Sequence, residues 1–89
     1  MFFYTYVLEC RLGNTKSYYI GYCSDIEERI RQHKNGEVFF TKKYESIKLV
    51  YYEACTSKTD AIKRELQLKT GFGRGYIKKR LDSYLASRD

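Results

Sequence analysis

Arg29 and His33 stand four residues apart in the segment SDIEERIRQHKNG, so a helix would carry both on one face. A guanidinium binds anions and an imidazole transfers protons near neutral pH, so the pair could serve catalysis. Less specific interpretations stay open. Arg29 could be solvated or pair with Asp25 one turn earlier, and His33 could cap the helix end, where a positive charge is favourable. The spacing indicates a polar helix face and does not by itself assign a reaction.

A second helix is predicted to carry Glu65 at the edge of its core-facing stripe. Ala61, Glu65 and Lys69 share one face, beside Ile62 and Leu66. A carboxylate in that place needs a cationic partner, a metal ion or water. An ordinary surface ion pair between Glu65 and Lys69 explains the spacing as well, and helical spacing alone favours it.

Two tyrosines on neighbouring strands could project their hydroxyls to one place. In the run SYYIGYC, strand alternation puts Tyr19 and Gly21 on one face and the residues between and beside them on the other. A glycine inside a strand often marks close approach by another chain segment or a ligand. Tyr6 lies on the expected partner strand, so Tyr6 and Tyr19 could act together, although core packing explains either ring alone.

The elements that must position these residues begin with an aromatic hairpin. Residues Phe2 to Cys10 and Ser17 to Cys23 are rich in aromatic and β-branched side chains, and the polar link RLGNTK between them predicts a turn. The apolar run from Leu49 to Cys55 predicts a third strand that pairs with the hairpin. Residues 36–48 mix rings and lysines without a helical period, so most of this segment is expected to be a loop.

Capping signals predict three helices around the sheet. Ser24 and Glu27 have the spacing of a capping box, so the first helix is expected to start at Ser24 and to stop near Gly36. Ser57 starts the second helix, which runs to Thr70. The glycines of GFGRG are expected to form a turn before the last, amphipathic helix. The apolar positions of that helix are Ile77, Leu81, Tyr84 and Leu85. The prediction is an α+β fold of order ββαβαα, with a three-stranded antiparallel sheet flanked by helices.

The totals describe one small, basic domain. The 89 residues, of which 17 are Lys or Arg and 11 are Asp or Glu, allow a single domain over residues 1–89 with a modest core. A net charge of +6 favours phosphate backbones or anionic lipid as partners. No apolar run approaches the ~20 residues of a membrane span, and the N-terminus lacks a basic signal region, so a cytoplasmic protein is expected.

The cysteines Cys10, Cys23 and Cys55 are odd in number and widely spaced, which favours reduced thiols in a cytosol over a disulfide framework. With His33 they could form a zinc site, but the short paired spacing typical of such sites is absent. Plain buried thiols are the expected state.

The segment around the tyrosines resembles the GIY-YIG nuclease family. The second triplet of the family name is literal here, in Tyr19, Ile20 and Gly21, whereas the first reads YTY at residues 4–6 and keeps only its tyrosine. Over nearly its whole length the chain is similar to the catalytic domain of the excinuclease C subunit and to GIY-YIG homing endonucleases. The resemblance implies a small nuclease domain.

The rest of the family pattern follows in order. The helix after YIG carries Arg29 and His33 in the family's arginine and histidine positions and ends at Asn35 and Gly36. Glu65 stands in the place of the family's metal-binding glutamate. One departure is that residues 69–89 contain no asparagine, whereas larger members have a late asparagine near the metal site.

The resemblance implies a DNA endonuclease that hydrolyses phosphodiester bonds with Mg²⁺ or Mn²⁺, in DNA repair or recombination, with low sequence specificity. Glu65 would bind the metal, and Arg29 would hold the non-bridging phosphate oxygens. Tyr6, assisted by His33, is the candidate general base, and Tyr19 would hold the water or the phosphate. The two tyrosines could exchange these roles.

Basic residues that could guide DNA to that site are Lys42, Lys43, Lys69, Arg74, Lys78, Lys79 and Arg80, with Phe39, Phe40 and Tyr44 as rings for unpaired bases. A solvated charged face is the simpler interpretation of such a run. RNA is not excluded as a ligand, and a protein partner could supply target choice. The alternative function is a non-catalytic nucleic-acid-binding module with the same fold, and a structural interaction protein is a third.

Overall fold

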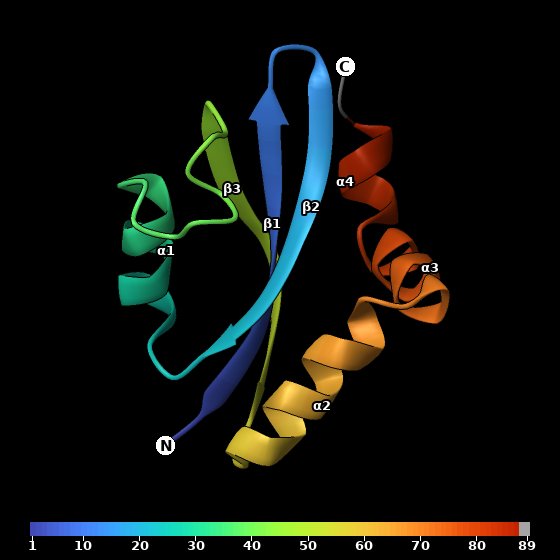
Figure 1. Cartoon of the computed structure of the whole chain (residues 1–89). Coiled ribbons are helices and arrows are strands. Elements are labelled where there is room, and N and C mark those ends of the chain that lie inside the picture. The colour runs from blue at the N-terminus through green and yellow to red at the C-terminus, as the bar shows by residue number, and fades with distance from the viewer. Residues whose placement is uncertain (88–89) are drawn as a thin grey trace.

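A three-stranded antiparallel sheet forms the centre of the computed structural model, which describes residues 1–87 (Figure 1). The strands lie in the order β2-β1-β3. They are β1 (Phe3–Leu12), β2 (Thr15–Cys23) and β3 (Ser46–Cys55), and the helices are α1 (Ile26–Lys34), α2 (Lys58–Leu68), α3 (Gly71–Arg80) and α4 (Asp82–Ala86). The predicted α+β fold is confirmed, with the last predicted helix divided into α3 and α4.

Both faces of the sheet are covered, and the central strand β1 carries the core. Residues 5–10 of β1 are all buried, and their side chains alternate between the faces. Tyr6 and Leu8 belong to the cluster that packs with α1, whereas Val7 belongs to the cluster that packs with α3 and α4. Figure 1 shows α1 on one side of the sheet and the other three helices on the opposite side. Because β2 is an edge strand, side chains from both faces can meet beside it.

The predicted hairpin is confirmed, but its strands are longer than expected. β1 runs to Leu12 and β2 starts at Thr15, so only two residues form the turn. The polar residues of the expected link pair across the two strands, because the backbone ladder does not require apolar side chains at an exposed end. β3 likewise starts at Ser46, ahead of its apolar run, and the predicted loop is confirmed up to residue 45.

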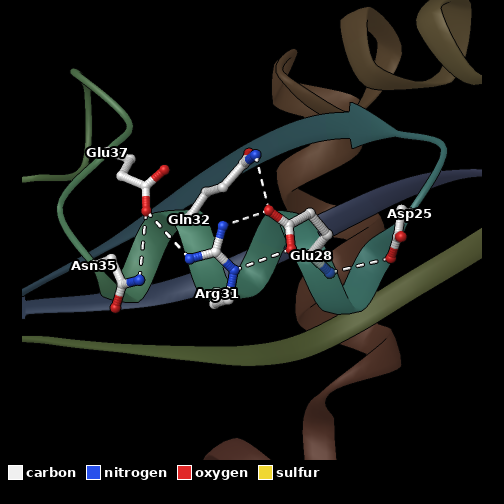
Figure 2. A network of polar contacts seen from close by, with 6 residues as sticks. All are labelled: Asp25, Glu28, Arg31, Gln32, Asn35 and Glu37. Carbon is white, nitrogen blue, oxygen red and sulfur yellow. Dashed lines mark hydrogen bonds and ion pairs between the residues drawn. The ribbon is translucent and has the colours of Figure 1, made fainter.

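A polar network covers the outer face of α1 (Figure 2). Asp25 caps this helix in place of the predicted Ser24, because its carboxylate accepts a hydrogen bond from the Glu28 backbone N–H at 3.1 Å. Arg31 then bridges Glu28 and Glu37, which ties the last turn of α1 to the loop that follows. Arg31 therefore engages Glu28 of α1 and Glu37 of the loop, and Arg29 is not among the residues of this network.

The GFGRG segment is helical, so the predicted turn is wrong. Thr70 caps α3, since its hydroxyl accepts a hydrogen bond from the Gly73 backbone N–H at 3.3 Å. A Cβ atom on Gly73 would overlap the backbone of Leu68, because the first turn of α3 lies directly against the end of α2. Close packing at this junction therefore outweighs the low helix propensity of glycine.

The apolar positions predicted for the last helix do cover the sheet. Ile77 and Leu81 are buried in one cluster with Val7, and Tyr84 and Leu85 pack against that cluster. None of the helices between residues 1 and 87 has the length and apolar character that a bilayer crossing requires.

Candidate active site

The Tyr6 ring crosses β2 at Gly21. The two residues are register partners on β1 and β2, and Tyr6 is fully buried. A Cβ atom on Gly21 would lie 2.7 Å from the Tyr6 hydroxyl, 2.8 Å from its Cζ atom and 3.1 Å from Cε2 of Tyr19. No side chain fits there, so the close approach expected at this glycine is the approach of Tyr6. Both phenols consequently lie on the α1 face of the sheet.

His33 joins Tyr6 to the loop through a buried chain of hydrogen bonds. Its Nε2 lies 2.8 Å from the Tyr6 hydroxyl and its Nδ1 lies 2.7 Å from the Thr41 hydroxyl. Tyr6, His33 and Thr41 are each at most 1% exposed. The Tyr19 ring stands edge-on to the imidazole, with centroids 5.1 Å apart. His33 therefore does not serve as a surface cap of α1, and Thr41 is a partner that helical spacing could not reveal.

Burial and the positive charge of Arg29 together determine the protonation states of Tyr6 and His33. Burial raises the pKa of the Tyr6 phenol above its ordinary range, with the Tyr19 charge acting the same way and the charge of Arg29 acting against it. Burial first, and then the positive charge of Arg29, lower the pKa of His33 to about 4. At neutral pH His33 is therefore neutral, with one ring nitrogen donating and the other accepting.

Arg29 is half-buried, and its charge acts on both the Tyr6 and the His33 side chains. Asp25 uses its carboxylate to cap α1 (Figure 2). The ion pairs among residues 1–87 do not include an Arg29–Asp25 pair. Arg29 lines a small cavity together with Tyr22 and Cys23 at the end of β2. Its positive charge opposes the effect of burial on the pKa of Tyr6.

A second group of residues forms what we call the edge pocket, a hollow of about 630 Å³ along the free edge of β2. Three of its residues belong to β2, one to the loop after α1, and four to α2, α3 and the turn between them. They are Tyr18, Tyr19, Ile20, Phe40, Glu65, Leu68, Lys69 and Arg74. Tyr19 thus reaches the pocket from the α1 face and Glu65 from the opposite face. The edge position of β2 makes this meeting possible.

Glu65 lies on the inner face of α2. The buried positions of this helix are Ala61 and Leu68, which are one turn before and one turn after Glu65. Leu66, expected in the core-facing stripe, is 61% exposed, so that part of the prediction is wrong. The Glu65 side chain is only 15% exposed, and its Oε2 accepts a hydrogen bond from Lys69 Nζ at 2.9 Å. The Lys69 pair exists, but the carboxylate belongs to the wall of a pocket.

The donor atoms suit a hard cation held by a single carboxylate. Within residues 1–87 no group of three or more His, Cys, Asp or Glu side chains could hold a metal, so the alternative zinc set does not form. The three cysteines are free thiols, and Cys10 and Cys23 are buried. Mg²⁺ keeps several of its waters and is commonly held by one or two carboxylates together with substrate phosphates. Glu65 in the edge pocket fits that mode of binding.

The predicted DNA-guiding residues lie in separate places. Lys69 and Arg74 line the edge pocket. Lys42 and Lys43 lie in the loop, each over an aromatic ring, at 5.0 Å from the Phe39 centroid and 5.3 Å from the Tyr44 centroid. The α3 residues Lys78, Lys79 and Arg80 are exposed.

Asn35 and Gly36, two residues of the family pattern, lie where α1 ends. Asn35 is the C-cap of the helix, and its backbone N–H bonds to the Arg31 and His33 carbonyls. Gly36 follows with a φ of 74°, so the chain turns into the loop that carries Thr41. Ile20 faces the other side of the sheet and packs with Val7.

The chain matches one described protein family and several individual proteins. A family model described as the GIY-YIG catalytic domain matches residues 2–82. The chain is similar to UPF0213 proteins of Staphylococcus saprophyticus, with 43% identity, and Staphylococcus epidermidis, with 38% identity. Each alignment spans 68 residues and covers 75% of this chain and 79% of the relative. A solution NMR structure of a UPF0213 protein from Bacillus halodurans is 32% identical, with a TM-score of 0.49, and the match covers 94% of this chain and 85% of that one.

Proposed function

Because the chain belongs to the GIY-YIG catalytic domain family, we propose that it is a divalent-metal-dependent DNA endonuclease. The observation that carries the proposal is the edge pocket, where Tyr19 and Glu65 line one hollow. The buried Tyr6 phenol and His33 imidazole both contact the Tyr19 ring. The proposed substrate is the phosphodiester backbone of DNA, cut with low sequence specificity in repair or recombination.

Tyr19 is the tyrosine that we propose to contact the phosphodiester or its attacking water. Tyr19 is half-buried and lines the edge pocket, whereas Tyr6 is fully buried and its hydroxyl is bonded to His33. The raised pKa of Tyr6 also disfavours its phenolate at neutral pH. The exchanged assignment of the two tyrosines is therefore preferred, with Tyr6 and His33 holding the Tyr19 ring in position.

Glu65 would hold the divalent cation, which when bound supplies positive charge for the phosphoryl oxygens and the leaving oxygen. Lys69 and Arg74 offer further positive charge on the same wall to hold the substrate backbone. For Arg29 to clamp a phosphate, its guanidinium must turn from the Tyr6 phenol toward the edge pocket. In its present position it counteracts the effect of burial on Tyr6.

A cleavage assay tests the proposal. Single-stranded, duplex, nicked and flapped DNA are incubated with Mg²⁺ or Mn²⁺ and the wild type, Glu65→Gln or Tyr19→Phe. Tyr52→Phe is the matched control, because Tyr52 is exposed on the opposite edge strand, β3. Metal-dependent cutting by the wild type and the control, lost in both other variants, is the expected result. Cutting that survives both substitutions would refute the site.

A non-catalytic nucleic-acid-binding module is the second candidate. The Lys69 ammonium occupies one oxygen of Glu65 and competes with a cation for it. Salt-sensitive DNA binding that survives Glu65→Gln, with no cutting under any divalent ion, would select this alternative. RNA in place of DNA is tested with the same set of strands.

The proposed location is the cytoplasm. Cys10, Cys23 and Cys55 are free thiols, which persist in a reducing compartment. Target choice by a protein partner is also proposed, since the edge pocket offers few groups that could read a base sequence.

A further inference from the structure

A second hollow, which we call the apolar cavity, is lined by residues of β1, β2, α3 and α4. Figure 1 shows α3 and α4 on the face of the sheet opposite α1. Its volume is about 430 Å³, within the ~300–1,000 Å³ of ordinary ligand pockets. The apolar residues that line it are Val7, Ile20, Ile77, Leu81 and Leu85. These side chains come from both the sheet and the helices, so the cavity is a half-open hollow where the two layers meet.

Cationic side chains complete the lining. Lys16, Arg74 and Lys78 also line the cavity, and all three are exposed, so their charged ends stand at its mouth. Within residues 1–87 no acidic side chain lines the cavity. An apolar interior with a positive mouth suits a ligand that has a flat or aliphatic body and a negative group attached to it.

The apolar cavity adjoins the edge pocket. Tyr18, Ile20 and Arg74 line both hollows. Tyr18 is 42% exposed, and its hydroxyl donates a hydrogen bond to Glu9 at 3.4 Å, which holds its ring between them. Glu9 is itself buried in β1 and also accepts a hydrogen bond from Tyr84 at 3.3 Å. A strand whose phosphate lies in the edge pocket would therefore present its neighbouring nucleotide to the cavity.

We propose that the apolar cavity receives one unpaired nucleobase next to the phosphodiester held in the edge pocket. The inference rests on the proposed function and narrows its substrate class to DNA with an unpaired nucleotide beside the cleaved bond. Arg74 would hold the phosphate between the two hollows, and Tyr18 would contact the base as it enters. Because the interior is apolar, the base is held by its ring, and its identity is not read by hydrogen bonds.

Metal-free binding tests the cavity separately from cleavage. Three DNA duplexes are compared in EDTA by fluorescence anisotropy: one with a single unpaired 2-aminopurine, one with an abasic residue at that position, and one fully paired. The abasic duplex keeps the phosphate and loses only the ring, so we expect it to bind about tenfold more weakly than the 2-aminopurine duplex. Equal affinity for the two would overturn the proposal without any variant.

Filling the cavity supplies the second measurement. Leu85→Trp puts a larger ring into the hollow, and Leu66→Trp is its control on an exposed position of α2. The tenfold preference should disappear in Leu85→Trp and remain in Leu66→Trp; a preference that survives in Leu85→Trp would place the base elsewhere and refute the cavity. If Leu85→Trp does not fold, Leu85→Phe replaces it, and the wild-type comparison still decides.

The outcomes separate the two proposals. Metal-dependent cutting without preference for the unpaired ring would remove the base site and leave the nuclease. A ring preference without cutting would remove the nuclease and leave the base site. A fluorescent fatty acid that binds the wild type and not Leu85→Trp, while the duplexes show no preference, would overturn the proposal in favour of an acyl chain.

Discussion

Replacing Gly21 with alanine should destabilise the protein, because the Tyr6 ring occupies the space of the added methyl group. The Cβ atom would lie 2.7 Å from the Tyr6 hydroxyl and 2.8 Å from its Cζ atom. Overpacking of a core costs ~1–3 kcal/mol, and a displaced Tyr6 would leave His33 Nε2 without its partner, at ~1–3 kcal/mol. The reduced entropy of the unfolded chain offsets ~0.4–1 kcal/mol. The net expectation is a loss of about 1–5 kcal/mol in the free energy of unfolding, with a central value of about 3 kcal/mol.

Urea unfolding followed by circular dichroism measures this loss, which should lower the midpoint by roughly 1–2 M. Gly75→Ala is the matched control, since a Cβ atom on this α3 residue meets nothing within 4 Å. That substitution should stabilise the protein by ~0.5–1 kcal/mol through helix propensity.

A double-mutant cycle with Tyr6→Phe isolates the cause. The hydroxyl is the atom nearest the new methyl group, and its bond to His33 is already absent in the phenylalanine background, so Gly21→Ala should cost at least ~1 kcal/mol less there. An unchanged cost in that background, or a Gly21→Ala protein as stable as the Gly75→Ala control, would refute the explanation of this glycine.

Three further predictions concern polar groups. The free energy of unfolding should fall by roughly 2–4 kcal/mol as the pH drops from about 6.5 to about 4, because the unfolded chain protonates His33 across that range and the folded chain does not. Urea unfolding at a series of pH values measures this fall, and His33→Gln should flatten the profile. Thr41→Val should lower the free energy of unfolding by ~1–3 kcal/mol, since it leaves His33 Nδ1 unpaired, and a thermal melt within a degree of wild type would contradict this. Arg64→Gln should cost about 1 kcal/mol through loss of its paired hydrogen bonds to Glu53 at 2.9 Å, whereas the exposed Lys63→Gln should stay within ~0.5 kcal/mol of wild type in the same assay.

The sequence predicted the parts of this protein that follow from local periodicity. Strand alternation correctly put Tyr19 and Gly21 on one face, and the Ser57 cap correctly started α2. Local signals failed where a neighbouring segment decided the outcome. The GFGRG run reads as a turn by propensity, but packing of Gly73 on Leu68 makes it helical. Leu66 reads as core by its spacing, but α2 turns Ala61 and Leu68 inward instead.

The sequence by itself determined the family, the α+β order of elements and the residue types available for catalysis. Only the tertiary structure decided how those residues meet. The order β2-β1-β3 puts β2 at an edge, so Tyr19 and Glu65 from opposite faces line one pocket. Thr41 reaches His33 because the loop folds back over α1. These contacts join residues far apart in the chain, and their geometry depends on how layers pack, which no local spacing encodes.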